Sequence, residues 1–181
     1  MDLTLRLNAR LQPIHQFQFE DVIHTLLTKK GIGETSGGGV AQDPEGETTY
    51  CEIEIHLDET KPNNIIQLLE ILSKTGIPKG STLWSADPEF NIEVGTLEGL
   101  AYYFNNTELP YSIYETCDVN YALEQMEKAI EGIGKLYSYW KGRAYTALYF
   151  YGHSFFEMKQ KIEAFNATYP LCQKSRIEQI A

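Results

Sequence analysis

The segment Cys51-Glu52-Ile53-Glu54-Ile55-His56-Leu57 decides the first part of the fold. Its apolar and polar residues alternate strictly, which is typical of a β-strand with one face in the core and one in water. The sequence therefore predicts a strand over about residues 49–57, with Cys51 and Ile53 directed inward. The side chains of Glu52, Glu54 and His56 project together from the opposite face.

A glycine-rich segment precedes this strand and runs from Lys30 to Val40. Five of the nine residues 31–39 are glycine, and this predicts either a mobile loop or a backbone that another group approaches closely. We expect a surface loop that is mobile until it is bound. A nucleotide-binding loop is disfavoured, because Ser36 stands where a dinucleotide motif needs its third glycine and no Gly-Lys-Ser/Thr ends the run.

The layout around the strand is repeated near the other end of the chain. Residues 51–57 are followed by a helix, a break at Ile77-Pro78 and a strand. Residues 147–151 are followed by a helix that opens with the capping box Ser154-Phe155-Phe156-Glu157, a break at Tyr169-Pro170 and a final strand. The two halves of the chain are therefore expected to share one arrangement.

These elements predict an α+β fold with a mostly antiparallel sheet and helices packed on one face. Two ferredoxin-like halves that share one sheet fit this layout. The halves would be residues 1–86 and 118–181, joined by a connector over 87–117 within a single domain, 1–181. Residues 108–117 are expected to be extended, and one long aromatic strand is expected within 136–151.

Charge limits the classes of partner. The chain has 25 Asp and Glu against 15 Lys and Arg, a net charge of -10. This excess would repel nucleic-acid phosphates and anionic membranes, and it would attract basic proteins. No apolar run could cross a bilayer, and the alternation over residues 1–7 does not resemble a secretion signal. We expect a cytoplasmic protein without a nucleic-acid or membrane partner.

The trio of Glu52, Glu54 and His56 has two interpretations. It would suit a metal or acid–base site if Asp58 or Glu47 joined it. The commoner alternative is the solvated face of a sheet whose other side is covered by helices. Nucleophilic catalysis has little support, since the histidines are scattered and no serine stands in a Gly-x-Ser-x-Gly turn.

Tyrosines and other aromatics crowd two segments, residues 102–114 and 137–151. A strand can direct at most half of its side chains into the core, so several tyrosines are expected at the surface. Tyrosine offers rigid contact area and is enriched in protein interfaces. An ordinary core with tyrosines at its rim is an equally good interpretation.

Several segments resemble a known kind of protein as a set: Gly33–Gly39 with Cys51–Ile55, Gly95–Ala101, and Ala147–Gly152 with Tyr169–Gln173. They are similar to small bacterial proteins found as immunity partners beside secreted polymorphic or contact-dependent toxins, although no defined family emerges. The resemblance spans most of the chain. It implies a cytoplasmic protein that binds a cognate toxin domain and blocks it, and it supplies no active-site residues.

The leading hypothesis is a non-enzymatic binding module, an immunity protein that occludes a basic toxin domain, with no cofactor, catalytic or metal-binding residue. The alternative is a small-molecule or metal-dependent enzyme built on the Gly31–Gly39 segment and the trio described above. The residues expected to contact the partner come from the glycine segment, the turn after it, the polar strand face and the tyrosine-rich segments: Glu34, Ser36, Gly37, Gly38, Glu45, Glu47, Glu52, Glu54, Tyr102 and Tyr149.

Overall fold

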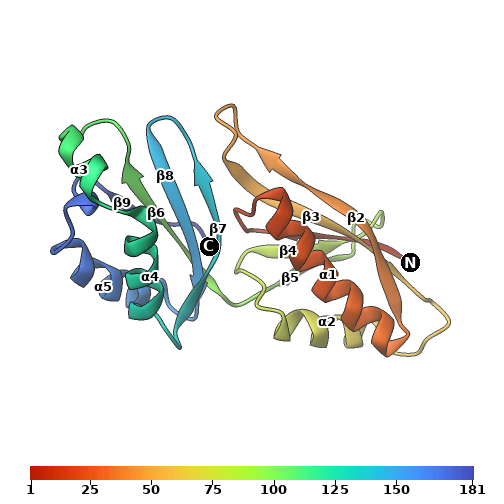
Figure 1. The fold of residues 1–181 in the computed structure, drawn as a ribbon. Coiled ribbons are helices and arrows are strands. Elements are labelled where there is room, and N and C mark those ends of the chain that lie inside the picture. Colours follow the sequence, from red (N-terminus) through yellow and green to blue (C-terminus); the bar gives the residue numbers. More distant parts are fainter.

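The computed structural model describes the whole chain, residues 1–181. The chain begins with seven elements that form the first half of the molecule (Figure 1). They are β1 (Asp2–Leu7), α1 (Pro13–Lys30), β2 (Gly33–Gln42), β3 (Thr48–Leu57), α2 (Asn64–Lys74), β4 (Ser81–Trp84) and β5 (Asn91–Val94). Their strands form one antiparallel sheet in the order β2-β3-β1-β4-β5.

The second half of the molecule repeats this plan. Its elements are β6 (Glu98–Asn105), α3 (Tyr111–Thr116), α4 (Val119–Ala129), β7 (Gly134–Lys141), β8 (Tyr145–Gly152), α5 (Phe155–Asn166), a short 3₁₀ turn (Pro170–Cys172) and β9 (Arg176–Gln179). Its strands form a second antiparallel sheet in the order β7-β8-β6-β9. In both halves the first and third strands of a β-α-β-β-α-β unit lie at the centre, which is the ferredoxin-like arrangement.

The predicted α+β class is therefore confirmed, and so is the repeat: β3, α2 and β4 occupy the same places as β8, α5 and β9. The expectation of one shared sheet is wrong, because each half has its own. The first sheet also extends beyond the predicted boundary through β5, and β6 belongs to the second sheet rather than to a connector. The helix α3 lies where an extended segment was predicted, and β7 and β8 form a hairpin where one long strand was expected.

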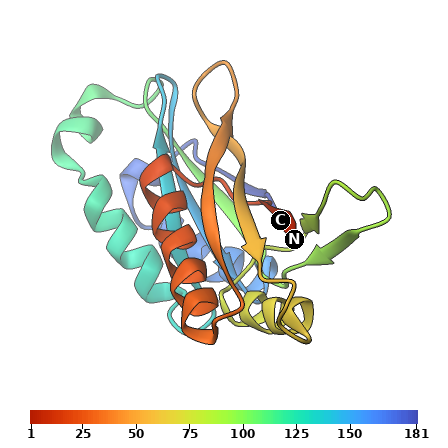
Figure 2. The same cartoon turned by 90° about the vertical axis from the view of Figure 1, so that its right-hand side faces the viewer.

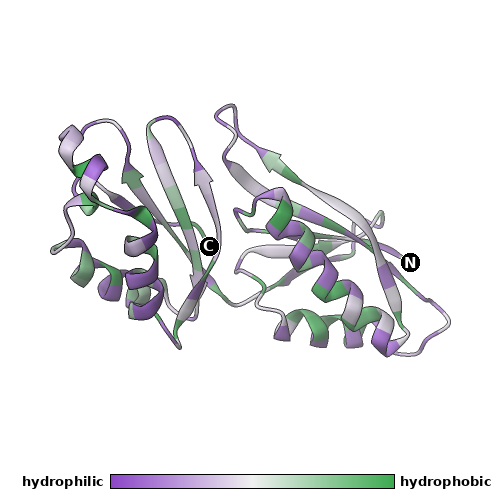
Figure 3. Cartoon of the chain, in the orientation of Figure 1, coloured by the Kyte–Doolittle hydropathy of each residue, from purple (hydrophilic) through white to green (hydrophobic).

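Alternation along the strands places one core between the first sheet and its helices. Leu3, Leu5 and Leu7 of β1 and the apolar residues of β3 are buried against α1 and α2. In Figure 3, hydrophobic and hydrophilic residues alternate along these helices, as expected for helices with one buried side. None of the helices has the length and hydrophobicity needed to span a membrane.

The second sheet is covered on both faces. Leu100, Tyr102 and Phe104 of β6 pack with α4 and α5, which lie to the left of the sheet in Figure 1. The opposite face carries Tyr103, Tyr149 and Tyr151, and these join the core of the first half. The first half therefore buries the face of the second sheet that α4 and α5 leave uncovered.

Hydrogen bonds fix the two halves together along the segment between β1 and α1. The Tyr151 hydroxyl accepts a bond from the Arg10 amide at 2.9 Å. The Ser138 hydroxyl accepts one from the Gln12 amide, also at 2.9 Å. On the far side of the junction, the Tyr137 hydroxyl donates to the Gly76 carbonyl at 2.8 Å. The view in Figure 2 shows the β2–β3 hairpin (orange) beside the β7–β8 hairpin (blue), and the β4–β5 hairpin projecting at the other edge.

The glycine-rich segment is a strand, which corrects the prediction of a mobile loop. Residues 33–42 form β2 and pair with β3 in continuous register, apart from irregularities after Thr35 and after Ala41. Gly37 lies at the first irregularity with a φ of 130°, a conformation that other residues rarely adopt. At Gly38 a Cβ would stand 2.2 Å from the Glu52 carbonyl oxygen and 2.8 Å from Gln16 Nε2. The glycines therefore allow α1 and β3 to approach the strand closely.

Gly38→Ala is expected to lower the free energy of unfolding by about 1–3 kcal/mol, as an overpacked site does. The neighbouring Gly39 provides a matched control, because nothing lies within 4 Å of its Cβ direction. Gly39→Ala is expected to be neutral, or to stabilise by up to about 1 kcal/mol through a less flexible unfolded chain. Urea denaturation of both variants measures the difference, and equal stabilities would contradict the close approach at Gly38.

Candidate functional site

One face of the first sheet has no helix or strand over it. We call it the open face, and it consists of the side chains that point away from α1 and α2. The register of the five strands assigns fifteen residues to it: Asp2, Thr4, Arg6, Glu34, Gly37, Gly39, Ala41, Tyr50, Glu52, Glu54, His56, Thr82, Trp84, Asn91 and Glu93. Strand alternation produces this set, because core residues alternate with these side chains along β1, β3 and β4, and β2 and β5 pair with those strands in register.

Strand β1 supplies a partner to each polar side chain of β3 on the open face. Arg6 donates to Glu52 Oε1 through Nε at 2.9 Å and through Nη2 at 2.8 Å. The Thr4 hydroxyl donates to Glu54 Oε2 at 3.0 Å. These contacts join residues that are directly opposite in the antiparallel register, where side chains on one face meet.

The third cross-strand contact involves the imidazole of His56. His56 Nδ1 lies 2.7 Å from Asp2 Oδ1. This hydrogen bond lowers the pKa of the Asp2 carboxyl below its usual value. Both side chains are largely in water, so the pair adds little to stability.

The predicted trio of Glu52, Glu54 and His56 does share one face of β3, as the alternation indicated. However, the three side chains turn to three different neighbours on β1 rather than to a common point. No group of three or more His, Cys, Asp or Glu side chains in the chain is arranged to hold a metal ion. The residues present therefore do not fit the metal centre that was considered as an alternative.

Carboxylates dominate the open face. It holds five, from Asp2, Glu34, Glu52, Glu54 and Glu93, and one guanidinium, from Arg6. Arg6 lies against Glu52 and over the Tyr50 ring, with 4.6 Å between its Cζ and the ring centroid. The negative charge of the other four carboxylates is left without a basic side chain, other than the imidazole of His56.

An aromatic side chain lies among these charges. Trp84 of β4 is 37% exposed and pairs with Thr4 of β1 and Asn91 of β5. Exposed tryptophans in a polar setting are the kind of residue that carries binding energy in protein interfaces. The open face thus combines a negative field with a central aromatic contact.

The structure brings four of the predicted partner-contacting residues together on the open face. Glu34 and Gly37 of β2 lie opposite His56 and Glu54, and Glu52 and Glu54 lie beside them on β3. Ser36 is exposed at the irregularity of β2, and Glu45 is exposed in the β2–β3 turn. Gly38 is also on β2, but a side chain at this position would point toward Gln16 on the helix side of the sheet.

Two predicted contact residues are buried and a third, Glu47, is half-buried and engaged within the chain, so their assignment to a partner surface is corrected. Tyr102 is 0% exposed, and its hydroxyl donates to Asn166 Oδ1 at 2.8 Å. Tyr149 is 1% exposed, and its hydroxyl donates to Glu47 Oε1 at 2.8 Å. The Glu47 side chain is 13% exposed and forms an ion pair with Arg10. Both tyrosines have core positions because the second sheet is covered on two faces.

Known proteins offer little guidance. No protein-family profile and no curated protein sequence matches the chain. Solved structures with a related outline include the first two RRM domains of the yeast poly(U) binding protein, at 11% identity, with 100% of this chain and 99% of that chain covered and a TM-score of 0.26. Another is the regulatory subunit of aspartate kinase from Thermus thermophilus, at 10% identity, with 90% and 91% covered and a TM-score of 0.27. Similarity at this level supports no argument about function.

Sequence reasoning missed several members of the open face. Asp2, Arg6 and Glu93 alternate with core residues along their strands. However, pairing between strands that are distant in the sequence decides which side chains share one face of the sheet. The strand β5, which carries Glu93, was not predicted. For β1 a signal was present, because Leu3, Leu5 and Leu7 alternate with polar residues in the same way as β3. Trp84 lies in the strand predicted after Ile77-Pro78, but no local pattern showed that its side chain shares a face with the acidic residues.

Proposed function

We propose that this protein is a non-enzymatic binding module whose open face captures a basic surface of another protein. In this proposal the partner is a toxin domain, and the chain acts as its immunity protein by covering the site that the toxin uses. The observation that supports this most directly is the uncovered, acid-rich face of the first sheet.

The contrast between the two halves supports a binding role for this face. Both halves have the same strand order, and in the second half the corresponding sheet face is buried by tyrosines packed against the first half. The corresponding face of the first sheet is free and carries charged residues, whereas that of the second carries tyrosines. A protein partner would complete the same layered arrangement.

Charge explains how a partner would be selected. The net charge of -10 attracts cationic proteins at long range. At short range, Glu34, Glu54 and Glu93 accept hydrogen bonds from lysine or arginine, and Trp84 provides an apolar contact. Such a surface resembles a polyanion to a toxin whose active site binds a polyanionic substrate. Association would be fast at low salt and would slow as the salt concentration rises.

The test first asks whether a gene beside the gene for this chain encodes a toxin domain, and it uses that domain as the partner; the absence of such a gene would count against the proposal. The triple variant Glu34→Lys, Glu54→Lys and Glu93→Lys is expected to slow association with that domain by tenfold or more, on the order of the known effect of steering. It is also expected to remove the protection of growth that co-expression gives. Surface plasmon resonance at several salt concentrations measures the rate.

A second triple variant separates the open face from total charge. Glu115→Lys, Glu124→Lys and Glu127→Lys change the net charge by the same amount on exposed positions of α3 and α4. This control is expected to retain protection and most of the association rate. If both triple variants bind equally, or if the wild-type rate ignores salt, the open face is not the binding surface.

A further inference from the structure

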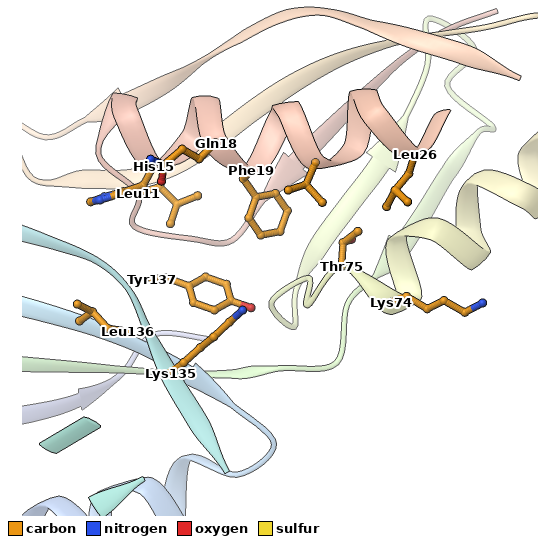
Figure 4. Close-up of a pocket in the computed structure, with 11 residues that line it drawn as sticks. Leu11, His15, Gln18, Phe19, Leu26, Lys74, Thr75, Lys135, Leu136 and Tyr137 are labelled. Atoms are coloured by element: carbon orange, nitrogen blue, oxygen red, sulfur yellow. The ribbon is translucent and has the colours of Figure 1, made fainter. Parts of the chain in front are cut away.

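A pocket of about 440 Å³ lies at the junction of the two halves (Figure 4). Phe19, Val22 and Leu26 of α1 form one wall, and Leu136 and Tyr137 of β7 form the opposite wall. The last residue of α2 and Thr75 close one end. The volume is within the range of about 300–1,000 Å³ that is usual for small-molecule sites.

The walls of the pocket are held in place by contacts between the halves. The rings of Phe19 and Tyr137 pack against each other at the junction, with centroids 6.2 Å apart. The Tyr137 hydroxyl is fixed by its bond to the Gly76 carbonyl, and its ring packs on Tyr151 at 4.8 Å. The pocket is thus built from rigid elements of both halves, as preformed ligand sites are.

The charged groups around the pocket are all basic. Lys135 lies on the wall formed by β7 and Lys74 at the rim, and no carboxylate lines the pocket. Neither ammonium forms an ion pair with a carboxylate of the chain. Lys135 Nζ lies 5.2 Å from the centroid of the Tyr137 ring. Burial raises the pKa of Tyr137 to about 12, so this ring remains neutral beside the lysine at ordinary pH.

We propose that this pocket binds a small amphipathic anion: a carboxylate carried on an apolar aliphatic or aromatic body. The apolar body lies against Phe19, Leu26 and Tyr137, and the carboxylate accepts hydrogen bonds from Lys135, with Lys74 adding positive charge at the rim. Because both halves line the pocket, the ligand contacts both and holds their junction. This site is distinct from the open face and does not depend on the function proposed for that face.

Because the protein is acidic, a preference for a negatively charged ligand is a sensitive test of the proposed site. A chain with a net charge of -10 attracts cations to nearly all of its surface, so a preference for an anion must come from a local site. Octanoate, 1-octanol and octylammonium share one apolar body and differ in charge. We expect octanoate to bind most tightly and octylammonium least, with amide shifts in a ¹⁵N-labelled sample at Val22, Leu26 and Tyr137.

Two lysine variants locate the anion. Lys135→Met is expected to weaken octanoate binding about tenfold, the usual loss for one charge-assisted hydrogen bond, and to leave 1-octanol binding nearly unchanged. Lys141→Met is the matched control, because Lys141 is exposed on the same strand and does not line the pocket. Shifts absent from the pocket, equal binding of octanoate and 1-octanol, or equal effects of the two variants would each overturn the proposal.

Discussion

Above about pH 10 the protein is expected to lose stability steeply and to unfold within one to two pH units. The cause is a set of tyrosines in the second sheet. Tyr102, Tyr103, Tyr149 and Tyr151 are each at most 1% exposed, and burial raises the pKa of all four above the ordinary value of 10.0. A phenolate cannot be accommodated in this core at low cost.

The direction follows from proton counting. Above pH 10 the unfolded chain releases tyrosine protons that the folded chain retains, so each further rise in pH favours unfolding. Below that pH both states hold the protons, and the full stability is present. Each tyrosine contributes about 1.4 kcal/mol per pH unit in this window, so four contribute up to about 5 kcal/mol per unit. Small domains are stable by only about 5–15 kcal/mol.

Urea denaturation followed by tryptophan fluorescence measures this effect at a series of pH values from about 8 to 11. Tyr102→Phe retains the ring and removes one titrating hydroxyl, so it is expected to reduce the pH slope by about one quarter. Its stability at neutral pH falls by about 1 kcal/mol with the lost hydrogen bond to Asn166. A free energy of unfolding that stays constant up to pH 11 would contradict the burial of these hydroxyls.

Glu47→Ala is expected to lower the free energy of unfolding by about 3–5 kcal/mol, although Glu47 lies in a turn next to a surface hairpin. Its carboxylate accepts hydrogen bonds from Tyr103 at 2.6 Å and Tyr149 at 2.8 Å, and it forms the ion pair with Arg10. Removing it leaves the half-buried Arg10 guanidinium without its counter-charge and two buried hydroxyls without their acceptor. The cost is that of an uncompensated charge at the junction of the two halves.

Thermal or urea unfolding at neutral pH measures this loss, and two further variants show whether the ion pair or the turn causes it. Glu45→Ala, in the same turn but exposed, is expected to change stability by no more than about 0.5 kcal/mol. The double variant Arg10→Met with Glu47→Leu removes both charges and is expected to recover the part of the loss that comes from the unpaired charge, while the part due to the two hydroxyls remains. An equal loss in Glu45→Ala and Glu47→Ala would show that the turn, rather than the ion pair, is responsible.

The elements of the fold with regular periodicity could be predicted from the sequence. The strand over residues 49–57 and the cap at Ser154 depend on local patterns, and both are present: residues 48–57 form β3, and the Ser154 hydroxyl accepts from the Glu157 amide. The repeat of strand, helix, break and strand was also predicted. These features depend on neighbours along the chain, which the sequence displays directly.

The errors arose where distant segments decide the outcome. Glycine favours loops by its flexibility, but residues 33–42 become a strand because β3 pairs with them and α1 needs their small surface. The tyrosines of β6 and β8 were expected partly at the surface, because a sheet normally has one exposed side. Nothing in their local sequence shows that the other half of the molecule covers that side. For the same reason Glu47 could not be distinguished from the exposed Glu45.

The dependence of the second sheet on the first half has a consequence for the order of events during synthesis. Residues 1–97 emerge from the ribosome before the second half has been synthesised, and domains generally fold as they emerge. The first half has its helices over one sheet face and charges on the other, so before the second half forms it exposes only the part of its core that the tyrosines later cover. The tyrosine face of β6 and β8 would be an exposed, aggregation-prone surface if it formed alone. Because the first half is synthesised first, it can cover the aromatic surface as soon as that surface forms. A chain with the two halves in the opposite order would lack this protection against aggregation.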